Sequence, residues 1–274
     1  PILLEAIFAH YRSFGHMVIY WDKIRALIAR FGDEMTRPLL LCFTRALVFS
    51  SREDEIPEFK DYRPAVEAWN SGGAQDVAQD DFVDMSAKKA LDRCVSSSHS
   101  DPLTVYNALL KAICWNMLHF EERYGQRTDL PAAHNVNWLD FTHGITFSNA
   151  VRKICARYPQ FWREGLLQMA CFVGRNKNYT DASQDLAAWQ VDNAEAFLKE
   201  ALVKHHDHGI QDYIVACHRL KTITALLEEV QAQPDQSWAE TGAAALNRYL
   251  NSGFKGKHVL RFAKQALSLV NLED

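Results

Sequence analysis

The chain has 274 residues, of which 48% are hydrophobic and 11% aromatic, so it can bury a large core within one domain. Its net charge is −4, and its acidic and basic residues are interspersed, which argues against nucleic acid as a partner. The apolar stretch PLLLCFTRALVF is interrupted by Arg45, well short of the roughly 20 residues that span a bilayer, so we expect no membrane segment.

Six cysteines occur singly, and no C-x-x-C pair indicates zinc, iron–sulfur or thioredoxin chemistry. Cysteines in this pattern are typical of small buried side chains in a reducing compartment, so we expect a cytoplasmic protein. The chain begins at Pro1, with neither a methionine nor the charge pattern of a signal peptide. We therefore expect the natural N-terminus to lie upstream of this sequence.

Apolar residues recur at helical spacing almost throughout, which predicts an all-α protein: a single domain over residues 1–274 with about ten to twelve helices. The first strongly marked helix is HMVIYWDKIRALIARF, which Gly15 and Gly32 bracket. The polar stretch SGGAQDVAQDD, residues 71–81, has no periodicity and predicts an exposed, protease-sensitive loop. FVDMSAKKALDRC then predicts a short helix.

The second half of the chain carries clearer helix boundaries. Asp101 and Pro102 are typical of an N-cap and a first helical position, and we expect their helix to end at Gly125. Capping-box spacing marks two later helices, at Asp192 with Glu195 and at Ser237 with Glu240. The last helix is expected from about Lys257 to Val270.

Four of the eleven histidines fall within HHDHGIQDYIVACH, residues 205–218, around a predicted helix start. Imidazole binds metals and moves protons near neutral pH, so this crowding indicates an active-site wall. If Gly209 opens the helix, His208 and His218 lie about 15 Å apart along its axis and cannot bind one ion from that helix alone. Partners of His218 must come from another helix; the alternative is a core histidine that bonds a side chain or carbonyl.

Two carboxylate–imidazole pairs have helical spacing. Asp140 could orient His143 or share a metal with it, provided that the helix has begun by Asp140. Equally, Asp140 could cap the helix, with His143 in its first turn. The second pair is His119 with Glu122 near a helix C-terminus, where the helix dipole favours a protonated histidine without any catalytic role.

Several familiar sites are absent from the sequence. No Glu-x-x-His occurs, which disfavours a ferritin-type di-iron centre. No Walker loop, G-x-G-x-x-G, G-x-S-x-G or H-E-x-x-H occurs either, so we expect no flavin motif and no nicotinamide Rossmann domain.

The charged segment around Glu53 and Glu58 is typical of a solvated surface; the alternative is that one of them points inward toward a histidine site. His16, with Tyr20 one turn later, could line a cavity or bond near the first turn.

The helices around these histidines resemble a known family. NWLDFTHGITFSNAVRKI, GLLQMACFVGRNKNY, DHGIQDYIVACHRLK and KHVLRFAKQALSLV resemble, in order and character over roughly residues 100–270, segments of the questin oxidase-like proteins. These are helical enzymes associated with oxidative ring opening of anthraquinones without a recognisable flavin domain. The matching histidines are His143, His208 and His258, and FGHMVIY adds His16 by its likeness to related bacterial proteins. Family members are longer at the N-terminus than this chain.

The resemblance implies an oxygenase-type oxidoreductase acting on an aromatic or polyketide-like small molecule in a histidine-lined cavity, with non-haem iron as a candidate cofactor. From the resemblance and the residue patterns together, we expect His16, His143, His208 and His258 as metal ligands, His143, His208, His218 and Asp140 in catalysis, and Tyr20, Trp138 and Phe147 against the substrate. Electrons would come from NADPH or from an external donor, such as a reductase or a Rieske-type protein. The rival interpretation is a non-enzymatic helical ligand-binding or scaffolding domain. We expect His143 and His208, with a third histidine, to face one cavity in the enzyme, and dispersed histidines in the rival.

Overall fold

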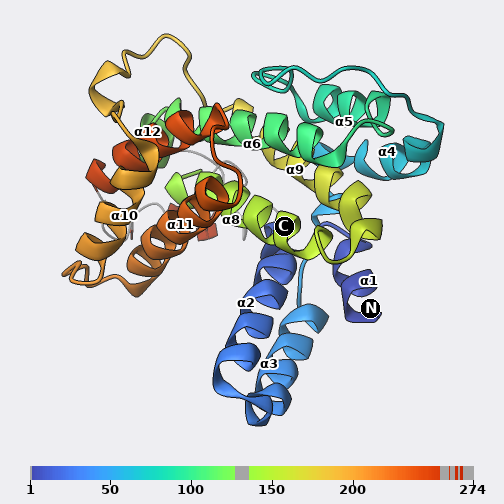
Figure 1. Ribbon diagram of the computed structural model, residues 1–274, viewed down its shortest axis with the longest axis horizontal. Helices are drawn as coiled ribbons and strands as arrows, with labels where there is room; N and C mark the ends of the chain where they lie inside the picture. The colour runs from blue at the N-terminus through green and yellow to red at the C-terminus, as the bar shows by residue number, and fades with distance from the viewer. Residues whose placement is uncertain (1, 127–135, 254–258, 260–262, 265, 268–274) are drawn as a thin grey trace.

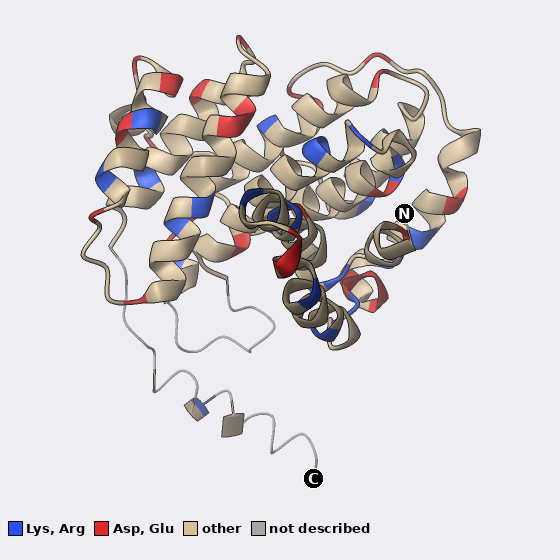
Figure 2. Cartoon of the chain, turned by 60° about the horizontal axis from the view of Figure 1, so that its bottom comes forward, with Lys and Arg blue, Asp and Glu red and all other residues tan. Residues whose placement is uncertain are grey.

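The computed structural model describes residues 2–126, 136–253, 259, 263, 264, 266 and 267. The prediction of an all-α domain is confirmed, since these residues form twelve α-helices joined by short 3-10 turns (Figure 1). Within the same residues, β-pairing is limited to two isolated bridges, Arg12 with Arg52 and Phe120 with Thr180. No helix in the described ranges combines the length and the apolar character that a bilayer crossing needs. Lys, Arg, Asp and Glu side chains are interspersed along the chain, as expected (Figure 2).

The N-terminal helices are α1 (Ile2–Phe8), α2 (His16–Phe31) and α3 (Thr36–Val48). Helices α2 and α3 form a hairpin that projects from the body of the molecule (Figure 1). The predicted bracketing of α2 by Gly15 and Gly32 is confirmed, and both glycines adopt the positive φ angles that favour glycine, 80° and 99°. At Gly15 a Cβ atom would also overlap the ring of Phe147, so the start of α2 lies directly against α8.

The next helices are α4 (Tyr62–Ala68), α5 (Ala87–Ser96), α6 (Pro102–Leu118) and α7 (Arg123–Gln126). Asp101 caps α6 by accepting a bond from Thr104 N, as predicted. The prediction that this helix reaches Gly125 is wrong, because α6 ends at Leu118. The chain leaves the helix to bond the segment after α9, where Glu121 N donates to Tyr179 O at 2.9 Å. The Arg248 guanidinium, which donates to Leu118 O, supplies a partner for a carbonyl at the end of α6.

The polar stretch between α4 and α5 forms no regular helix after Ser71, in agreement with the prediction. It is nevertheless attached to α5 by the Arg93 side chain and by backbone hydrogen bonds. Arg93 donates to Gln75 Oε1 at 3.1 Å and to Asp81 Oδ2 at 2.6 Å, and Gln75 N donates to Ser96 O. Exposure of this loop therefore does not mean that it is unattached.

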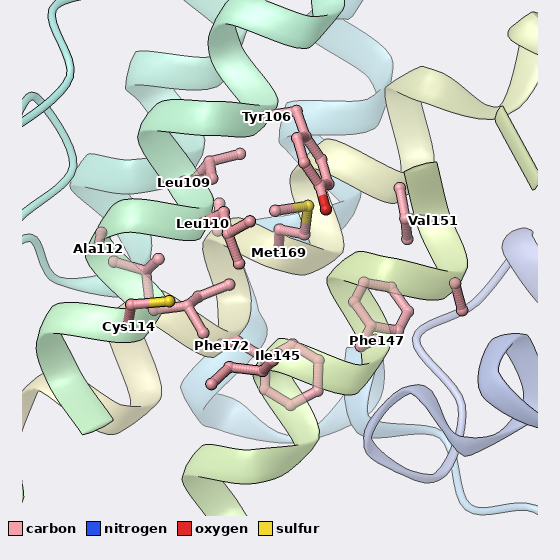
Figure 3. Packing of buried hydrophobic residues seen from close by; sticks show 14 of the residues in the cluster. Tyr106, Leu109, Leu110, Ala112, Cys114, Ile145, Phe147, Val151, Met169 and Phe172 are labelled. Carbon is pink, nitrogen blue, oxygen red and sulfur yellow. The ribbon is translucent and has the colours of Figure 1, made fainter. Parts of the chain in front are cut away.

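The remaining helices are α8 (Trp138–Cys155), α9 (Trp162–Lys177), α10 (Ala194–His205), α11 (Tyr213–Ala232) and α12 (Trp238–Asn251). Helices α6, α8 and α9 pack against one another and bury most of their side chains, including Leu109, Ile145, Phe147 and Phe172 (Figure 3). Helix α8 also contacts α2 on one side and α11 on another. This central position lets α8 bring together residues from both ends of the chain.

Three predicted helix starts differ in detail from the structure. Asn193, not Asp192, caps α10, because its extended backbone lets Oδ1 accept from Ala196 N at 2.8 Å. Ser237 precedes α12 with a helical backbone and makes no side-chain cap. Helix α11 opens after Asp212, which accepts from Ile214 N, and Gly209 stays in the preceding turn with φ 61°. Most of the predicted helix 257–270 lies outside the described residues.

Candidate functional site

Three of the predicted site histidines converge at the junction of α2, α8 and α11. Nε2 of His218 lies 3.1 Å from Nε2 of His143, and their ring centroids are 5.0 Å apart. The ring of His16 also contacts that of His143, with a centroid distance of 4.4 Å. We call His16, His143 and His218 the histidine cluster. Each of its members comes from a different helix.

A strained turn places His16 in the cluster. Ser13, Phe14 and Gly15 all have positive φ angles, 47°, 48° and 80°, which is costly for the two residues that have a Cβ atom. The turn is held by Ser13 N, which donates to Ser51 O at 3.1 Å, and by Gly15 N, which donates to Arg12 O at 2.9 Å. Its last residue leads directly into α2, so the first side chain of that helix is aimed at α8.

Backbone carbonyls determine which imidazole nitrogens remain available. His218 Nδ1 donates to Ile214 O at 2.7 Å, one turn earlier in α11, and His16 Nδ1 donates to Ser13 O. Because a carbonyl oxygen can only accept, both rings carry their hydrogen on Nδ1. The Nε2 atoms of His16 and His218 therefore have lone pairs that can bind a metal or accept a proton.

Burial and mutual repulsion keep the histidine cluster neutral at neutral pH. Burial lowers the pKa of His143 well below its usual value, and the positive charges of His16, Lys221 and His218 lower it further. Burial, and then Lys221, lowers the pKa of His218 to about 4. Burial also lowers the pKa values of His16 and Lys221. The arrangement favours uncharged imidazoles, which is the form that binds metals.

A cavity of about 220 Å³ lies beside two members of the cluster. His16 and His143 line it together with Phe14, Asp140, Phe172 and Arg175. The Arg175 guanidinium carbon lies 4.5 Å above the centre of the Phe14 ring, and Arg175 Nη1 donates to Glu58 at 3.1 Å. Phe14, Phe172 and Arg175 were not predicted as site residues, because nothing in the sequence separates them from other aromatic and basic residues on helices.

Asp140 lines this cavity but does not orient His143. Its carboxylate accepts from Asn137 N at 2.9 Å, while Asn137 Oδ1 accepts from Leu139 N at 2.8 Å, which together form a capping box. Its other near partner is Arg175, at 3.6 Å. The Asp140 carboxylate therefore stabilises the start of α8, in line with the alternative that Asp140 has a capping role. The N-cap residue itself is Asn137.

His208 lies away from the histidine cluster, so the prediction that it shares a cavity with His143 is wrong. It remains in the turn between α10 and α11, where its Nδ1 accepts from Ile210 N at 2.8 Å. Its ring lies 5.2 Å from that of His205, and both line a second pocket against α11 and α12. The separation follows from the late start of α11, which leaves His208 outside the helix that carries His218. His258 lies outside the described residues.

The three predicted substrate-binding aromatics have different positions. Tyr20 is 43% exposed, and its ring lies edge-on to His16 at 5.5 Å, so it flanks the histidine cluster. Trp138 packs against Phe120 and Tyr249 in the core. Phe147 is fully buried against Phe172. All three assignments are corrected, because none of these side chains lines the cavity; the helical spacing of Trp138 and Phe147 reflects core packing.

Of the other sequence candidates, Glu53 points inward and Glu58 does not reach the cluster. Glu53 is 3% exposed, accepts from Ser51 Oγ at 2.5 Å, and its charge raises the pKa of His16. His119 stacks on Trp115 with a centroid distance of 3.9 Å. Glu122 instead accepts from Ser252 Oγ at 2.9 Å, so the expected pair of His119 and Glu122 is not formed.

The spacing of His143 and His218 can be compared with that of two ligands of one metal ion. At a metal–nitrogen distance of about 2.1 Å, two nitrogens 3.1 Å apart subtend about 95° at one ion, an ordinary angle between neighbouring ligands. Among the described residues, however, no group of three His, Cys, Asp or Glu side chains could hold a metal ion. In the structure these two nitrogens share one hydrogen bond, in which His143 Nε2 donates to His218 Nε2.

No family model, curated protein or solved structure matches the chain. What the cluster can do must be argued from its own chemistry. The Nε2 lone pair of His218 accepts from His143 Nε2, and neutral imidazoles can bind a transition metal or pass a proton. A molecule bound in the adjoining cavity would contact both aromatic and charged side chains.

Proposed function

We propose that the chain is an oxygenase-type oxidoreductase that acts on an aromatic or polyketide-like small molecule at the histidine cluster, as the resemblance to questin oxidase-like proteins implies. The observation that carries the proposal is the meeting of His143 and His218 at 3.1 Å, with His16 beside them and a cavity next to the group. The six cysteines, all unpaired, support a reducing compartment, and we propose the cytoplasm.

The rival function, a ligand-binding or scaffolding domain, has no need for this arrangement. A structural histidine in a core is usually satisfied by a backbone carbonyl or a carboxylate. His218 already has such a partner in Ile214 O, yet its second nitrogen faces another imidazole rather than an apolar neighbour. Two facing imidazoles near Lys221 repel each other when both are protonated.

Non-haem iron is the cofactor that we propose. His143 and His218 would hold it through Nε2, with His16 as a further nitrogen donor, and imidazole is a suitable ligand for iron. Bound iron would supply the one-electron and oxygen chemistry that side chains lack. The carbonyls of Ser13 and Ile214 fix the tautomers of His16 and His218, so these two rings are prepared as ligands before any metal arrives. His208 has no part in this site.

The cavity limits the part of the substrate that can be enclosed. Its volume of about 220 Å³ is below the roughly 300–1,000 Å³ of pockets that enclose drug-sized ligands, so we propose that one or two rings enter. The rest of a larger aromatic substrate would remain outside the cavity. Phe14 and Phe172 would contact the enclosed rings, and Arg175 would contact a phenolic or carbonyl oxygen at their edge.

The experiment has two readouts on protein purified without a histidine tag. The first is the iron content after anaerobic incubation with Fe(II) and gel filtration. The second is oxygen consumption with a hydroxyanthraquinone, in the presence of NADPH and a reductase. His143→Ala should reduce both by about 100-fold or more, whereas His208→Ala, in the other pocket, should leave both unchanged. Full activity of His143→Ala, or equal losses in both variants, would refute the assignment.

A further inference from the structure

A second pocket, of about 380 Å³, lies between the end of α10, the turn that follows it, and helices α11 and α12. It contains two of the histidines that make HHDHG the densest histidine stretch of the sequence. Its volume falls within the roughly 300–1,000 Å³ range of small-molecule sites. None of the residues that line it also lines the cavity beside the histidine cluster.

The walls of this pocket combine apolar and polar side chains in similar shares. Phe197 and Ala201 of α10, Ile210 of the turn and Leu250 of α12 supply the apolar surface. His205, only 8% exposed, and Arg219 supply polar groups in the interior. Walls that combine apolar surface with polar groups suit an amphipathic small molecule.

Arg219 is held in place, but one of its N–H groups has no hydrogen-bond acceptor among the described residues. Its guanidinium carbon lies 5.5 Å from the centre of the Tyr249 ring, and Nη2 donates to Tyr249 O and Ser252 O at 3.4 Å each. Its Nε is buried and has no hydrogen-bond partner among the described residues. A buried charged donor without an acceptor is rare, and a ligand that brings an acceptor to it would remove the deficit.

The tautomer of His208 adds a second donor. Because Ile210 N donates to His208 Nδ1, that nitrogen carries a lone pair and the hydrogen of the neutral ring is on Nε2. His205 Nε2 donates to Ala216 O at 3.2 Å, which fixes the neighbouring ring. The turn between α10 and α11 thus presents an N–H group at a pocket that also contains a guanidinium.

The charges around the pocket leave Arg219 without a counter-ion in the interior. Lys204 and Glu200 pair with each other at 2.6 Å, so their charges cancel. Asp207 is exposed to solvent in the turn, and it has no ion pair with Arg219 in the part of the chain that the structure describes. A ligand with one negative group would give Arg219 a direct counter-ion.

We propose that this pocket binds a small molecule that has an apolar body of about two rings and one carboxylate. Arg219 would hold the carboxylate through its guanidinium edge, His208 would donate from Nε2, and the apolar body would contact Phe197, Ile210 and Leu250. Arginine is suited to this task because two parallel N–H groups match two carboxylate oxygens. The site is independent of the histidine cluster and goes beyond the proposed oxidoreductase function.

The test is isothermal titration of the full chain with 2-naphthoate and with its neutral counterpart, 2-naphthamide. Naphthoate should bind saturably at one site, and naphthamide should bind at least about tenfold more weakly. Arg219→Met keeps the length of the side chain but removes the guanidinium, and it should weaken naphthoate about tenfold or more while leaving naphthamide unchanged. Arg63→Met, an exposed arginine on α4, is the matched control and should bind both as the unaltered chain does.

A second variant covers the case in which Arg219→Met does not fold, as judged by circular dichroism. Asn251→Trp changes an exposed residue at the mouth of the pocket, so it should block both ligands without disturbing the core. The proposal is overturned if naphthoate shows no saturable binding to the folded chain, or if Arg219→Met, when folded, and Asn251→Trp leave its affinity unchanged. It is also overturned if His143→Ala abolishes naphthoate binding, because the ligand would then occupy the other cavity.

Discussion

His143 and His218 face each other through their Nε2 atoms at 3.1 Å, although they lie 75 residues apart in the sequence. His218 is fixed by a hydrogen bond within its own helix, whereas no carboxylate among the described residues bonds to His143. The position of His143 therefore depends on how α8 packs between α2 and α11. The integrity of the histidine cluster should respond to changes in that packing, even where they are far from the imidazoles.

Gly15→Ala should destabilise the fold and displace His16. Alanine is strained at φ 80°, and its Cβ would overlap the ring of Phe147. We expect a loss of about 1–3 kcal/mol in the free energy of unfolding, measured with urea. Gly253→Ala, where a Cβ would meet nothing within 4 Å, is the control and should change stability by less than about 0.5 kcal/mol. Equal stabilities of the two variants would contradict the close contact between α2 and α8.

Glu229→Ala should be among the most destabilising substitutions in the chain. This fully buried carboxylate accepts from Tyr106 Oη at 2.8 Å, from Asn149 Nδ2 at 2.9 Å and from Arg152 Nε at 2.7 Å. Its removal leaves Arg152 without its buried counter-ion, which costs about 3–5 kcal/mol in comparable cases.

Glu228→Ala is the matched control for that prediction. Glu228 is the adjacent residue, its side chain is 36% exposed, and it pairs with Lys153 at 3.1 Å. Solvent screens such a pair, so its loss should cost less than about 1 kcal/mol. Chemical denaturation of both variants measures the difference, and a loss at Glu228 as large as that at Glu229 would show that burial does not govern this network.

Stability should fall as the pH drops from about 6.5 toward 4. Burial lowers the pKa of His218 to about 4 and lowers the pKa values of His143, His119 and His205. Below the unfolded-state pKa of about 6.5, the unfolded chain therefore binds more protons than the folded chain, and acid favours unfolding. The stability that these buried neutral histidines contribute is fully present above the unfolded-state pKa of about 6.5. Differential scanning calorimetry between pH 7.5 and 4.5 should show a falling Tm.

The variant His218→Gln tests the source of this pH dependence. Glutamine can still donate to Ile214 O but does not titrate, so the fall in Tm between pH 7.5 and 4.5 should be smaller than in the unaltered chain. An identical pH profile would mean that His218 is not a major contributor. A rise in Tm on acidification would contradict the neutral state of the buried histidines as a group.

Arg93→Ala should release the loop at residues 71–81. The guanidinium binds Gln75, Asp81 and Ser97, and these bonds attach the loop to α5. Proteinase K should cleave the variant within this loop several times faster than the unaltered chain, with the sites identified by mass spectrometry. Lys88→Ala, which breaks only the exposed pair of Lys88 with Asp92 on the same helix, should not accelerate cleavage. Primary cleavage inside residues 102–118 would contradict the loop as the weakest internal segment.

The sequence by itself determined the helical class and several boundaries, because these depend on local chemistry. The 3.6-residue period of apolar side chains predicted the helices, Gly15 and Gly32 predicted the ends of α2, and Asp101 predicted the start of α6. Boundaries that depend on distant partners were predicted less well. The end of α6 at Leu118 is decided by Tyr179 and Arg248, which the local sequence does not contain.

Only the tertiary structure decided which histidines meet. His16, His143 and His208 were all candidates by resemblance, but His208 stays in the turn before α11, while His218 is carried into the cluster by that helix. Likewise, the period that predicts a buried face does not distinguish Trp138 and Phe147, which fill the core, from Phe14 and Phe172, which line the cavity. Periodicity determines which face of a helix is buried, whereas the packing of several helices determines whether a buried side chain meets protein or empty space.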